Sequence, residues 1–549
     1  MRDYDVIVIG SGAGGLTAAV ALAQAGRKVL VLEQHYLPGG WCHSFTLDGF
    51  SFSPGVHYIG ELGEGQRMRA IYEGLGVSDD LTFLELNPEG YDHVRSGERA
   101  FDYPRGKERL IQRLADHFPS EAAGARRVVE TLDAVGSAVD AVSTLRRPKD
   151  LLSRRTEVST FARKGLRSLK STIESNVKDP FLRAILAVQS GDNGLPPSRA
   201  STALHAMVMR HYFDGGFYPK GGARALPRAF VRALKRAGSE IRMRAKVEAI
   251  LLEGSGDRRR AVGVRLEDGE TIGADVVISN ADPRVTFERL LDPSELSGKL
   301  QRKLKRTRYS GSGVSLFAAL DVDPREHGLD SGNYWLSDTP DLETIYSGQA
   351  PRWLVQGGTP PGLFVTFTTL KDPSKSYGGL HTLEAFAMAP YSAFTAWEAS
   401  QHGDRPTAYD ALKARLADQM LAGVERILPG ARAHAVFKEI GTPLTNRFYV
   451  EATEGNFYGI EKTLDQLGPF SFPIRSEIPG LFCCGASTLG HGVAGATLSG
   501  LAAASSVLRL RTRELLKQQG KPIELLPCDA PETWPAHHRP ADLEEQKVA

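Results

Sequence analysis

Cysteine is scarce in this sequence, with four residues among 549. They are Cys42, Cys483, Cys484 and Cys528, and no two of them form a C-x-x-C pair. Because thiolate metal centres and disulfide frameworks are built on regular cysteine spacings, we predict neither and expect no metal site. A few free thiols fit a reducing compartment such as the cytoplasm.

An excess of charge of one sign is also missing. The formal net charge is +2, from 67 basic and 65 acidic residues, which argues against a nucleic-acid partner held by bulk electrostatics. An apolar run begins at the fifth residue, so we expect no signal peptide. The chain is too long for one simple core, and its 41% hydrophobic content is typical of globular proteins, so we predict two intertwined domains.

A clean membrane-spanning run is absent as well. Residues 481–508 contain no Asp, Glu, Lys or Arg, and a stretch of this length could cross a bilayer. It is interrupted, however, by Gly485, Gly490, Gly492, Gly495 and Gly500. We interpret it as a buried strand, a loop and a helix.

The first 33 residues carry the strongest pattern. Asp5–Ile9 is a short apolar run rich in β-branched residues, which predicts a buried parallel strand. Thr17–Ala25 is rich in alanine and predicts a helix that Gly26 ends. Lys28–Leu32 predicts a second buried strand. The order strand, helix, strand is that of a nucleotide-binding unit.

The turn between the first strand and the helix has the form G-x-G-x-x-G, at Gly10, Gly12 and Gly15. These glycines would allow the tight turn, the approach of a pyrophosphate and the contact of helix with strand. Glu33 ends the second strand, where a carboxylate accepts ribose hydroxyls. The sequence therefore predicts a bound dinucleotide, and without a second such turn in context we expect no separate NADPH domain.

Two segments downstream point to a family. Gly39-Gly40-Trp41-Cys42-His43-Ser44-Phe45 follows the ribose acid closely, and Gly55-Val-His-Tyr58 comes soon after. The paired glycines resemble those of flavoproteins of the amine-oxidase and phytoene-desaturase superfamily. Most members have Arg after the two glycines, whereas Trp41 stands here. The form G-G-x-C-H-x-F resembles the retinol saturase and carotenoid isomerase branch.

Later segments strengthen this resemblance. Ser190–Pro197 is a loop by its turn residues, and its G-L-P-P end resembles the saturase branch. Ile478–Ala486 predicts a strand that ends in a glycine turn, and Gly490–Ala496 opens the last helix. The positive end of that helix would suit the N1/O2 side of a reduced flavin. The family's cofactor is FAD.

The resemblance implies an α/β fold, in which a Rossmann-type FAD-binding domain is interleaved with an α+β substrate domain. We place the FAD-binding domain at residues 1–70, 215–285 and 440–512, and the substrate domain at 71–214 and 286–439. Strands are predicted near 246–252, 261–266, 274–279, 314–321, 363–369 and 381–387. Helical segments are predicted up to about residue 142. Residues 513–549, polar and proline-containing, are predicted to be a loose tail.

The resemblance also implies the residues that contact FAD. They come from the glycine turn, the ribose acid, the paired glycines, the first strand of a β-meander and the last helix: Gly10, Gly12, Ala13, Gly14, Gly15, Glu33, Gln34, Gly40, Trp41, Cys42, Val56, His57, Val247, Gly485, Ala486, Gly492, Val493 and Ala494.

The family implies chemistry on carbon–carbon double bonds of a long apolar lipid, here a carotenoid or retinoid-like isoprenoid. We favour a saturase or a cis–trans isomerase, with a phytoene-type desaturase, a flavin amine oxidase and a non-catalytic flavin-bearing lipid carrier as alternatives. Saturation needs a proton donor, and His57, Tyr58, Tyr458 and His491 are the candidates by motif position. An external electron donor or acceptor (NADPH, quinone or oxygen) would complete the cycle.

Residues 145–178 are strongly basic, with ten Lys or Arg and three acidic residues. Apolar residues are interleaved with them. Two interpretations stay open from sequence: a solvated helical face, or an interfacial segment that rests on anionic lipid. The second would place the protein at the cytoplasmic surface of a membrane as a peripheral protein.

Overall fold

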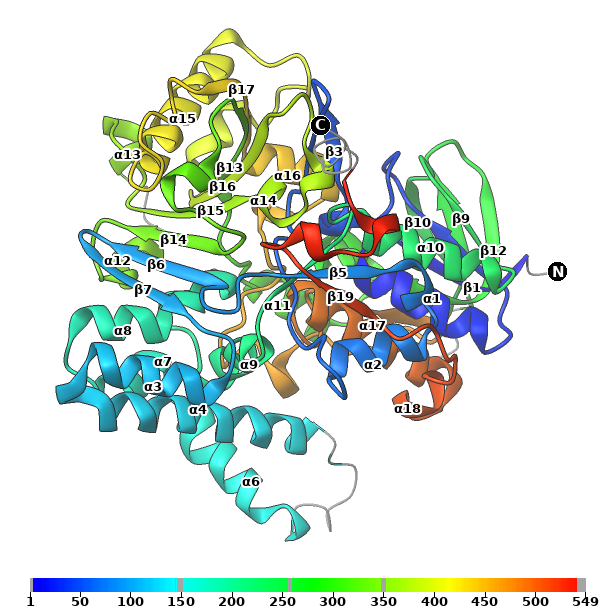
Figure 1. The fold of residues 1–549 in the computed structure, drawn as a ribbon. Helices are drawn as coiled ribbons and strands as arrows, with labels where there is room; N and C mark the ends of the chain where they lie inside the picture. The colour runs from blue at the N-terminus through cyan, green and yellow to red at the C-terminus, as the bar shows by residue number, and fades with distance from the viewer. Residues whose placement is uncertain are drawn as a thin grey trace.

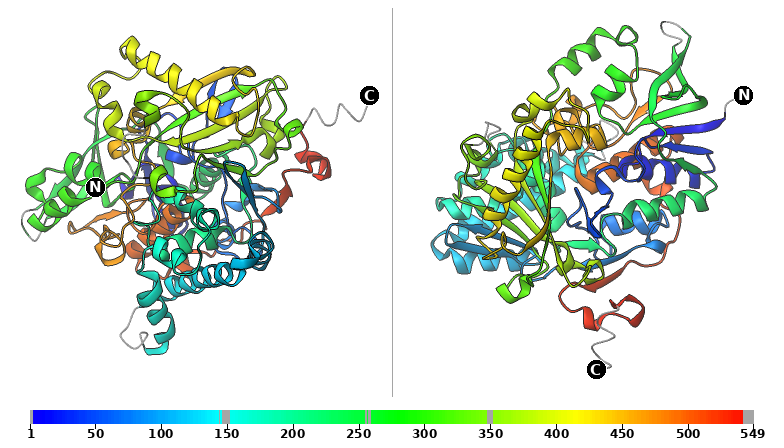
Figure 2. Two further views of the ribbon diagram at one scale, coloured as in Figure 1. Left: turned by 90° about the vertical axis from the view of Figure 1, so that its left-hand side faces the viewer. Right: turned by 90° about the horizontal axis from the view of Figure 1, so that it is seen from above.

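A computed structural model describes residues 3–143, 145, 152–254, 256, 259–346 and 352–540. Two lobes, each built on a seven-stranded sheet, lie side by side (Figures 1 and 2). A bundle of helices covers one end of the second sheet, at the lower left of Figure 1.

The first sheet has the order β10-β11-β12-β1-β2-β9, and β18 pairs with β12. Its strands β9, β2, β1, β12 and β18 run parallel, and Val8 pairs with Val31 on one side and Ile278 on the other. The strands are β1 (Tyr4–Ile9), β2 (Val29–Leu32), β9 (Glu240–Arg242), β10 (Val247–Glu253), β11 (Arg260–Leu266), β12 (Thr271–Ser279) and β18 (Leu481–Cys483).

Three helices cover one face of this sheet: α1 (Ala13–Gln24), α10 (Ala225–Arg236) and α17 (Gly492–Leu508). Helix α1 packs between the other two. The predicted strand–helix–strand unit at the N-terminus is therefore confirmed, with the helix beginning four residues earlier than expected. The charge-free stretch is a strand, a loop and α17, as predicted, and within the described chain no helix combines the length and apolarity that a membrane crossing requires.

The second sheet is mixed, with the order β17-β13-β16-β15-β14-β6-β7. All neighbours are antiparallel except β14 and β6, which run parallel. Its strands are β6 (Asp92–Ser96), β7 (Arg99–Tyr103), β13 (Gly313–Leu320), β14 (Asn333–Ser337), β15 (Gly362–Phe367), β16 (His381–Met388) and β17 (Ala435–Gly441). The prediction of helix up to residue 142 is wrong for β6 and β7, because their polar residues mask the alternation of a strand.

Helices on this lobe form the lower bundle and cover the sheet. They are α3 (Lys107–His117), α4 (Ala122–Ser143), α6 (Arg155–Thr160), α7 (Leu169–Glu174), α8 (Pro180–Ala187), α9 (Thr202–Tyr212), α12 (Leu342–Tyr346), α13 (Arg352–Gln356), α14 (Thr368–Lys371), α15 (Thr407–Val424) and α16 (Pro443–Val450). Helix α6 and the π-helical turn η4 (Phe161–Gly165) pack against α4, and α6 projects below the body in Figure 1.

A third, three-stranded sheet corrects the prediction of a loose tail. Strand β19 (Glu524–Pro527) pairs in parallel with β5 (Thr82–Glu85), which also pairs with β8 (Phe217–Pro219). Beyond β19, Trp534 is fully buried and its indole N–H donates to the Pro527 carbonyl at 2.7 Å. The tail is therefore packed as far as residue 540, while residues 541–549 lie outside the described chain.

The remaining elements connect the lobes. The hairpin β3 (Phe45–Leu47) and β4 (Phe50–Phe52) belongs to the N-terminal segment but packs on the second sheet, where the Phe52 and Phe437 rings stack at 5.9 Å. The other helices are α2 (Arg67–Gly74), α11 (Gly298–Arg306) and α18 (Thr512–Leu515).

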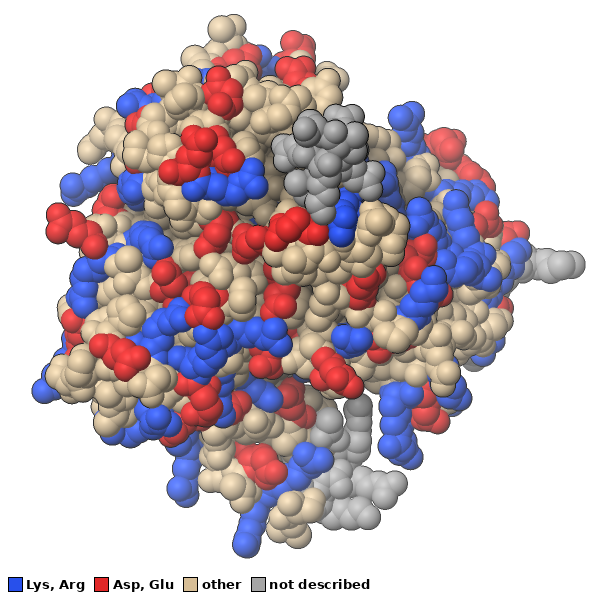
Figure 3. Space-filling model, viewed as in Figure 1, with Lys and Arg blue, Asp and Glu red and all other residues tan. Residues whose placement is uncertain are grey.

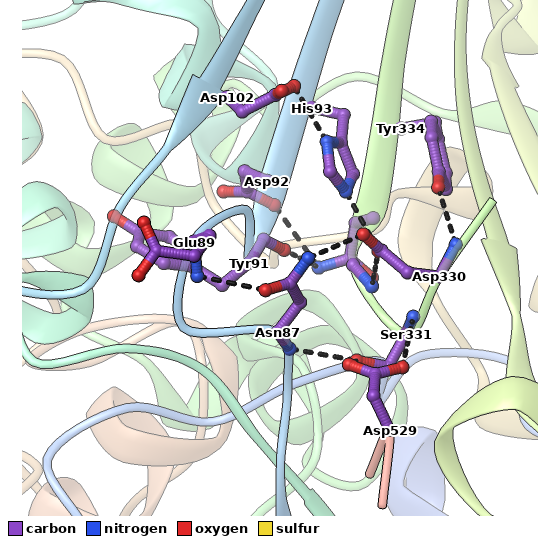
Figure 4. Close-up of polar contacts among 12 residues, drawn as sticks. Asn87, Glu89, Tyr91, Asp92, His93, Asp102, Asp330, Ser331, Tyr334 and Asp529 are labelled. Carbon is purple, nitrogen blue, oxygen red and sulfur yellow. Dashed lines mark hydrogen bonds and ion pairs between the residues drawn. The ribbon is translucent and has the colours of Figure 1, made fainter. Parts of the chain in front are cut away.

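A polar cluster fastens this lobe to the end of the chain (Figure 4). On β6, His93 is sandwiched between two carboxylates, with Nδ1 2.7 Å from Asp102 and Nε2 2.8 Å from Asp330. The two carboxylates outweigh burial and raise the pKa of His93 to about 9, so the imidazole is charged at neutral pH. Next to Asp330, Ser331 donates through its backbone N–H and its hydroxyl to Asp529 in the C-terminal segment.

Candidate active site

A cavity of about 2810 Å³ lies between the lobes and is lined by both. One end is the glycine turn at the start of α1. A Cβ on Gly15 would lie 2.2 Å from the Gly10 carbonyl oxygen, and one on Gly14 would lie 2.9 Å from the Gly485 nitrogen. These glycines therefore let the helix pack against the strand and the second loop. Gly12 differs, because the nearest atom to its Cβ would be the Asn280 side-chain nitrogen, at 2.7 Å.

Glu33 lies at the end of β2 on the cavity wall. Its Oε2 accepts from the Ser11 backbone N–H at 2.8 Å and the Ser11 hydroxyl at 2.6 Å, and its Oε1 accepts from the His35 N–H at 2.9 Å. Each carboxylate oxygen has further acceptor capacity for a ribose hydroxyl. Gln34 and Val247 line the same part of the cavity, so a nucleoside fits there.

The N-terminus of α17 faces the cavity from the other side. His491 is its N-cap and makes no side-chain capping bond, so the first backbone N–H groups of the helix remain available at a wall lined by Gly492, Val493 and Ala494. The partial positive charge of a helix N-terminus stabilises an anion there. The glycine turn, Glu33 and this helix end together fit a dinucleotide that carries an electron-rich ring.

Most of the predicted cofactor residues line this one cavity: Gly10, Gly12, Ala13, Gly14, Glu33, Gln34, Gly40, Trp41, Cys42, His57, Val247, Gly485, Ala486, Gly492, Val493 and Ala494. Gly15 and Val56 lie behind the wall. Asn280 was missed by the sequence reasoning, although it follows β12 at the carboxyl end of a parallel strand, where ligands of such sheets bind.

His57 lies at the meeting of the lobes. Its Nδ1 is 3.2 Å from Glu384 Oε2, and its ring packs against Phe386 at 4.8 Å. Burial lowers the pKa of His57, although Glu384 opposes this effect, so we expect a neutral ring at pH 7. Its backbone carbonyl accepts from Lys371 Nζ at 2.7 Å, and burial lowers the pKa of Lys371 to about 7.

Tyr58 reaches two acids. Its hydroxyl lies 3.3 Å from Asp92 Oδ2 and 3.2 Å from Asp192 Oδ2, and its ring stacks on Tyr212 at 4.1 Å. Burial raises the pKa of Asp92 to about 6 and, with the nearby Asp92, that of Asp192 to about 8. The sequence reasoning missed both acids.

The two other candidate residues converge on the same place. The rings of Tyr458 and His491 lie 5.2 Å apart, and His491 Nε2 donates to the Asp192 carbonyl at 2.8 Å. Burial lowers the pKa of His491 to about 4, so the ring is neutral. Its buried Nδ1 has no hydrogen-bond partner among the described residues, which leaves an acceptor beside the helix end.

Beyond these polar groups the cavity is apolar. One wall is the second sheet, with Trp335, Phe364 and Phe386. The other continues between helices of the lower bundle, where it is lined by Val139, Val142, Phe161, Leu166, Leu204, Met207 and Val208. Pockets for small molecules typically measure ~300–1,000 Å³, so this cavity has room for both a dinucleotide and a long apolar molecule.

The apolar end opens beside the basic segment predicted at residues 145–178. Residues 146–151 lie outside the described chain. In the rest, Arg154, Arg155, Arg163, Lys164 and Arg167 are exposed. Leu152 is 79% exposed and Leu166 46%, and Leu166 lines the cavity as well.

The fold and this cradle define a two-lobed flavoprotein. Residues 13–380 match the family of flavin-containing amine oxidoreductases, and the chain belongs to that family. Within it, the chain belongs to the group of retinol saturases and carotenoid isomerases.

Two relatives represent that group. The chain is 32% identical to the all-trans-retinol 13,14-reductase of Danio rerio, over 92% of this chain and 86% of the relative. It is 29% identical to the chloroplastic prolycopene isomerase of Daucus carota, over 92% and 80%. Among solved structures, an oxidoreductase from Methanosarcina mazei has a TM-score of 0.61 at 18% identity, covering 92% of this chain and all of that one. The chain is therefore a flavoenzyme, and the resemblance read from the sequence is confirmed.

Proposed function

We propose that this protein is an FAD-dependent saturase of carbon–carbon double bonds in a long apolar lipid, a retinoid or carotenoid-like isoprenoid. The observation that carries the proposal is the single cavity that joins a dinucleotide cradle to an apolar chamber. A bound, reduced flavin supplies hydride chemistry. The protein would hold the polyene against the flavin and exclude water. The relatives named for retinol reduction and prolycopene isomerisation support this choice.

The residues divide the work between the two ends of the cavity. The glycine turn, Glu33 and the start of α17 would hold FAD. Phe364, Phe386 and Trp335 would contact the chain of the lipid. The sequence has no second G-x-G-x-x-G turn in context, so we propose that the electrons come from an external donor such as NADPH or a quinol.

The test is anaerobic. Flavin in the purified protein is reduced with dithionite, and retinoids, carotenoids and unsaturated fatty acids are added in turn. We expect flavin reoxidation together with a lipid product heavier by two hydrogens, measured by absorbance and mass spectrometry. Reaction of only the oxidised flavin, with loss of two hydrogens from the lipid, would mean a desaturase instead. Hydrogen peroxide formed with amines would mean an amine oxidase.

A redox-neutral cis–trans isomerase is the second candidate, favoured by the relative named as prolycopene isomerase. The same experiment separates the two. An isomerase would change the retention time of the lipid without changing its mass, and the flavin would be in the same redox state before and after.

We further propose that the basic segment docks on an anionic membrane and delivers lipid to the cavity. Helix α6 projects from the body, and Lys and Arg side chains lie at the tip of this projection (Figure 3). Exposed Leu152 and Leu166 stand among these cations, and Leu166 also lines the cavity. Apolar side chains would enter the interface while the cations meet lipid phosphates.

A vesicle assay tests this docking. Each Lys or Arg near an anionic surface contributes about 1 kcal/mol, so replacing Arg155, Arg163 and Lys164 by Gln should weaken binding to anionic vesicles by roughly 100-fold. The matched control replaces three exposed cations of α11, Lys299, Arg302 and Lys305, by Gln and should bind like wild type. Equal loss in both triple variants, or equal binding to neutral vesicles, would contradict a specific docking face.

A further inference from the structure

The acidic pair around Tyr58 has a proton count that the geometry itself restricts. The Tyr58 hydroxyl lies 3.3 Å from Asp92 Oδ2 and 3.2 Å from Asp192 Oδ2. A phenol carries one proton and can donate to only one of them. If both carboxyls were ionised, the other contact would hold two bare acceptors together in a buried place. One carboxyl must therefore carry a proton and donate it to the phenol oxygen.

The surroundings decide which carboxyl is protonated. Asp92 is fully buried and accepts from Gln189 Nε2 and Asn333 Nδ2, both at 3.1 Å. The orientation of Asn333 is fixed, because its Oδ1 accepts from Lys371 Nζ at 2.6 Å. Two amide donors stabilise the ionised form of Asp92. Asp192 has Tyr58 as its partner and lines the cavity, so the proton belongs on Asp192.

We propose that Asp192 is the catalytic acid that delivers a proton to the lipid, with Tyr58 and Asp92 as the residues that position it. The role rests on the saturase function proposed above. One carbon of the double bond takes the hydride that a reduced flavin supplies. As the O–H bond of Asp192 breaks, its proton forms the C–H bond at the neighbouring carbon and a carboxylate remains. Solvent protons refill Asp192, and the external two-electron donor restores the flavin.

The groups around Asp192 leave one charge to consider. Tyr58, Tyr212, Tyr346 and Tyr458 surround it, and burial raises the pKa of each, so all four are neutral. His491, which donates to its backbone carbonyl, is neutral as well. The remaining influences are burial and the Asp92 carboxylate, and both favour the protonated form of Asp192. Saturation should therefore slow as pH rises through about 8, the pKa of Asp192.

The test uses Asp192→Asn in the flavin-loaded protein. The amide keeps the size of the side chain but delivers no proton, so saturation should fall by ~10²–10⁴-fold. Asp529→Asn is the matched control, because Asp529 is also a carboxyl that accepts from a hydroxyl, that of Ser331, but lies outside the cavity wall. It should saturate at the wild-type rate.

A second measurement needs no turnover. Infrared titration of the resting protein should show a protonated-carboxyl band that disappears as pH rises through about 8 in wild type and in Asp529→Asn. The band should be missing in Asp192→Asn, and in Tyr58→Phe it should titrate at a different pH.

The two measurements separate the proposals. Wild-type saturation by Asp192→Asn, or a band unchanged in that variant, would overturn the role of Asp192. If the wild-type protein saturates no lipid and yet shows the band, the saturase function fails and the catalytic role of Asp192 fails with it, although the proton lies where the geometry assigns it.

Discussion

Gly12→Val should yield a folded protein without flavin. The backbone of Gly12 has φ −61° and ψ 170°, which any residue can adopt, and the nearest atom to its new Cβ is the end of the Asn280 side chain. The fold therefore tolerates the change. The larger side chain, however, stands where the glycine turn would admit a pyrophosphate. We expect the flavin absorbance of the purified protein to fall close to zero while its circular dichroism stays like wild type.

Two comparison variants make this result specific. Gly15→Ala places a Cβ 2.2 Å from the Gly10 carbonyl, so the strand and helix must separate, and overpacking of this kind costs typically ~1–3 kcal/mol or more. That variant should be poorly folded with or without added FAD. Gly26→Ala meets no atom within 4 Å and bears only the strain of φ +82°, so it should keep its flavin. Full flavin content in Gly12→Val would show that this turn does not hold the cofactor.

Trp534→Ala should have the largest effect on stability of any change in the last forty residues. The indole is fully buried, and Lys220 Nζ lies 5.8 Å from the ring centre. Truncation of a buried Trp typically costs about 3–5 kcal/mol, through lost burial and the cavity left behind. Urea unfolding followed by fluorescence should therefore move to a lower midpoint.

Glu532→Ala is the control for this change. Glu532 is exposed and lies two residues away, and surface substitutions usually change the free energy of unfolding by less than ~0.5 kcal/mol. Equal midpoints for Trp534→Ala and the wild type would mean that the C-terminal segment does not stay docked in solution.

The sequence specified what depends on neighbours along the chain. The unit β1–α1–β2 carries its own signals, in the strand composition, the glycine turn and Glu33. The runs that became β13, β15 and β16 were found for the same reason, since buried strands are apolar throughout. Our division of the chain into FAD-binding and substrate domains stays a prediction.

Features that depend on distant contacts could not be found in this way. Asp192 belongs to a segment that its turn residues mark as a loop, and its chemistry comes from Tyr58 and Asp92, which lie far away in the sequence. The polar strand β6 became central because β14 pairs with it. In the tail, one buried Trp and a four-residue strand outweigh a composition that is otherwise typical of loose segments.

The order of strands in the first sheet also governs when the protein can be loaded. Strand β1 is made first, its neighbour β12 comes about 270 residues later, and β18 and α17 come about 200 residues after that. A nascent chain on the ribosome therefore lacks one wall of the cradle until synthesis is nearly complete. Flavin must enter a finished chain, so a cell short of this vitamin-derived cofactor would accumulate full-length apoprotein.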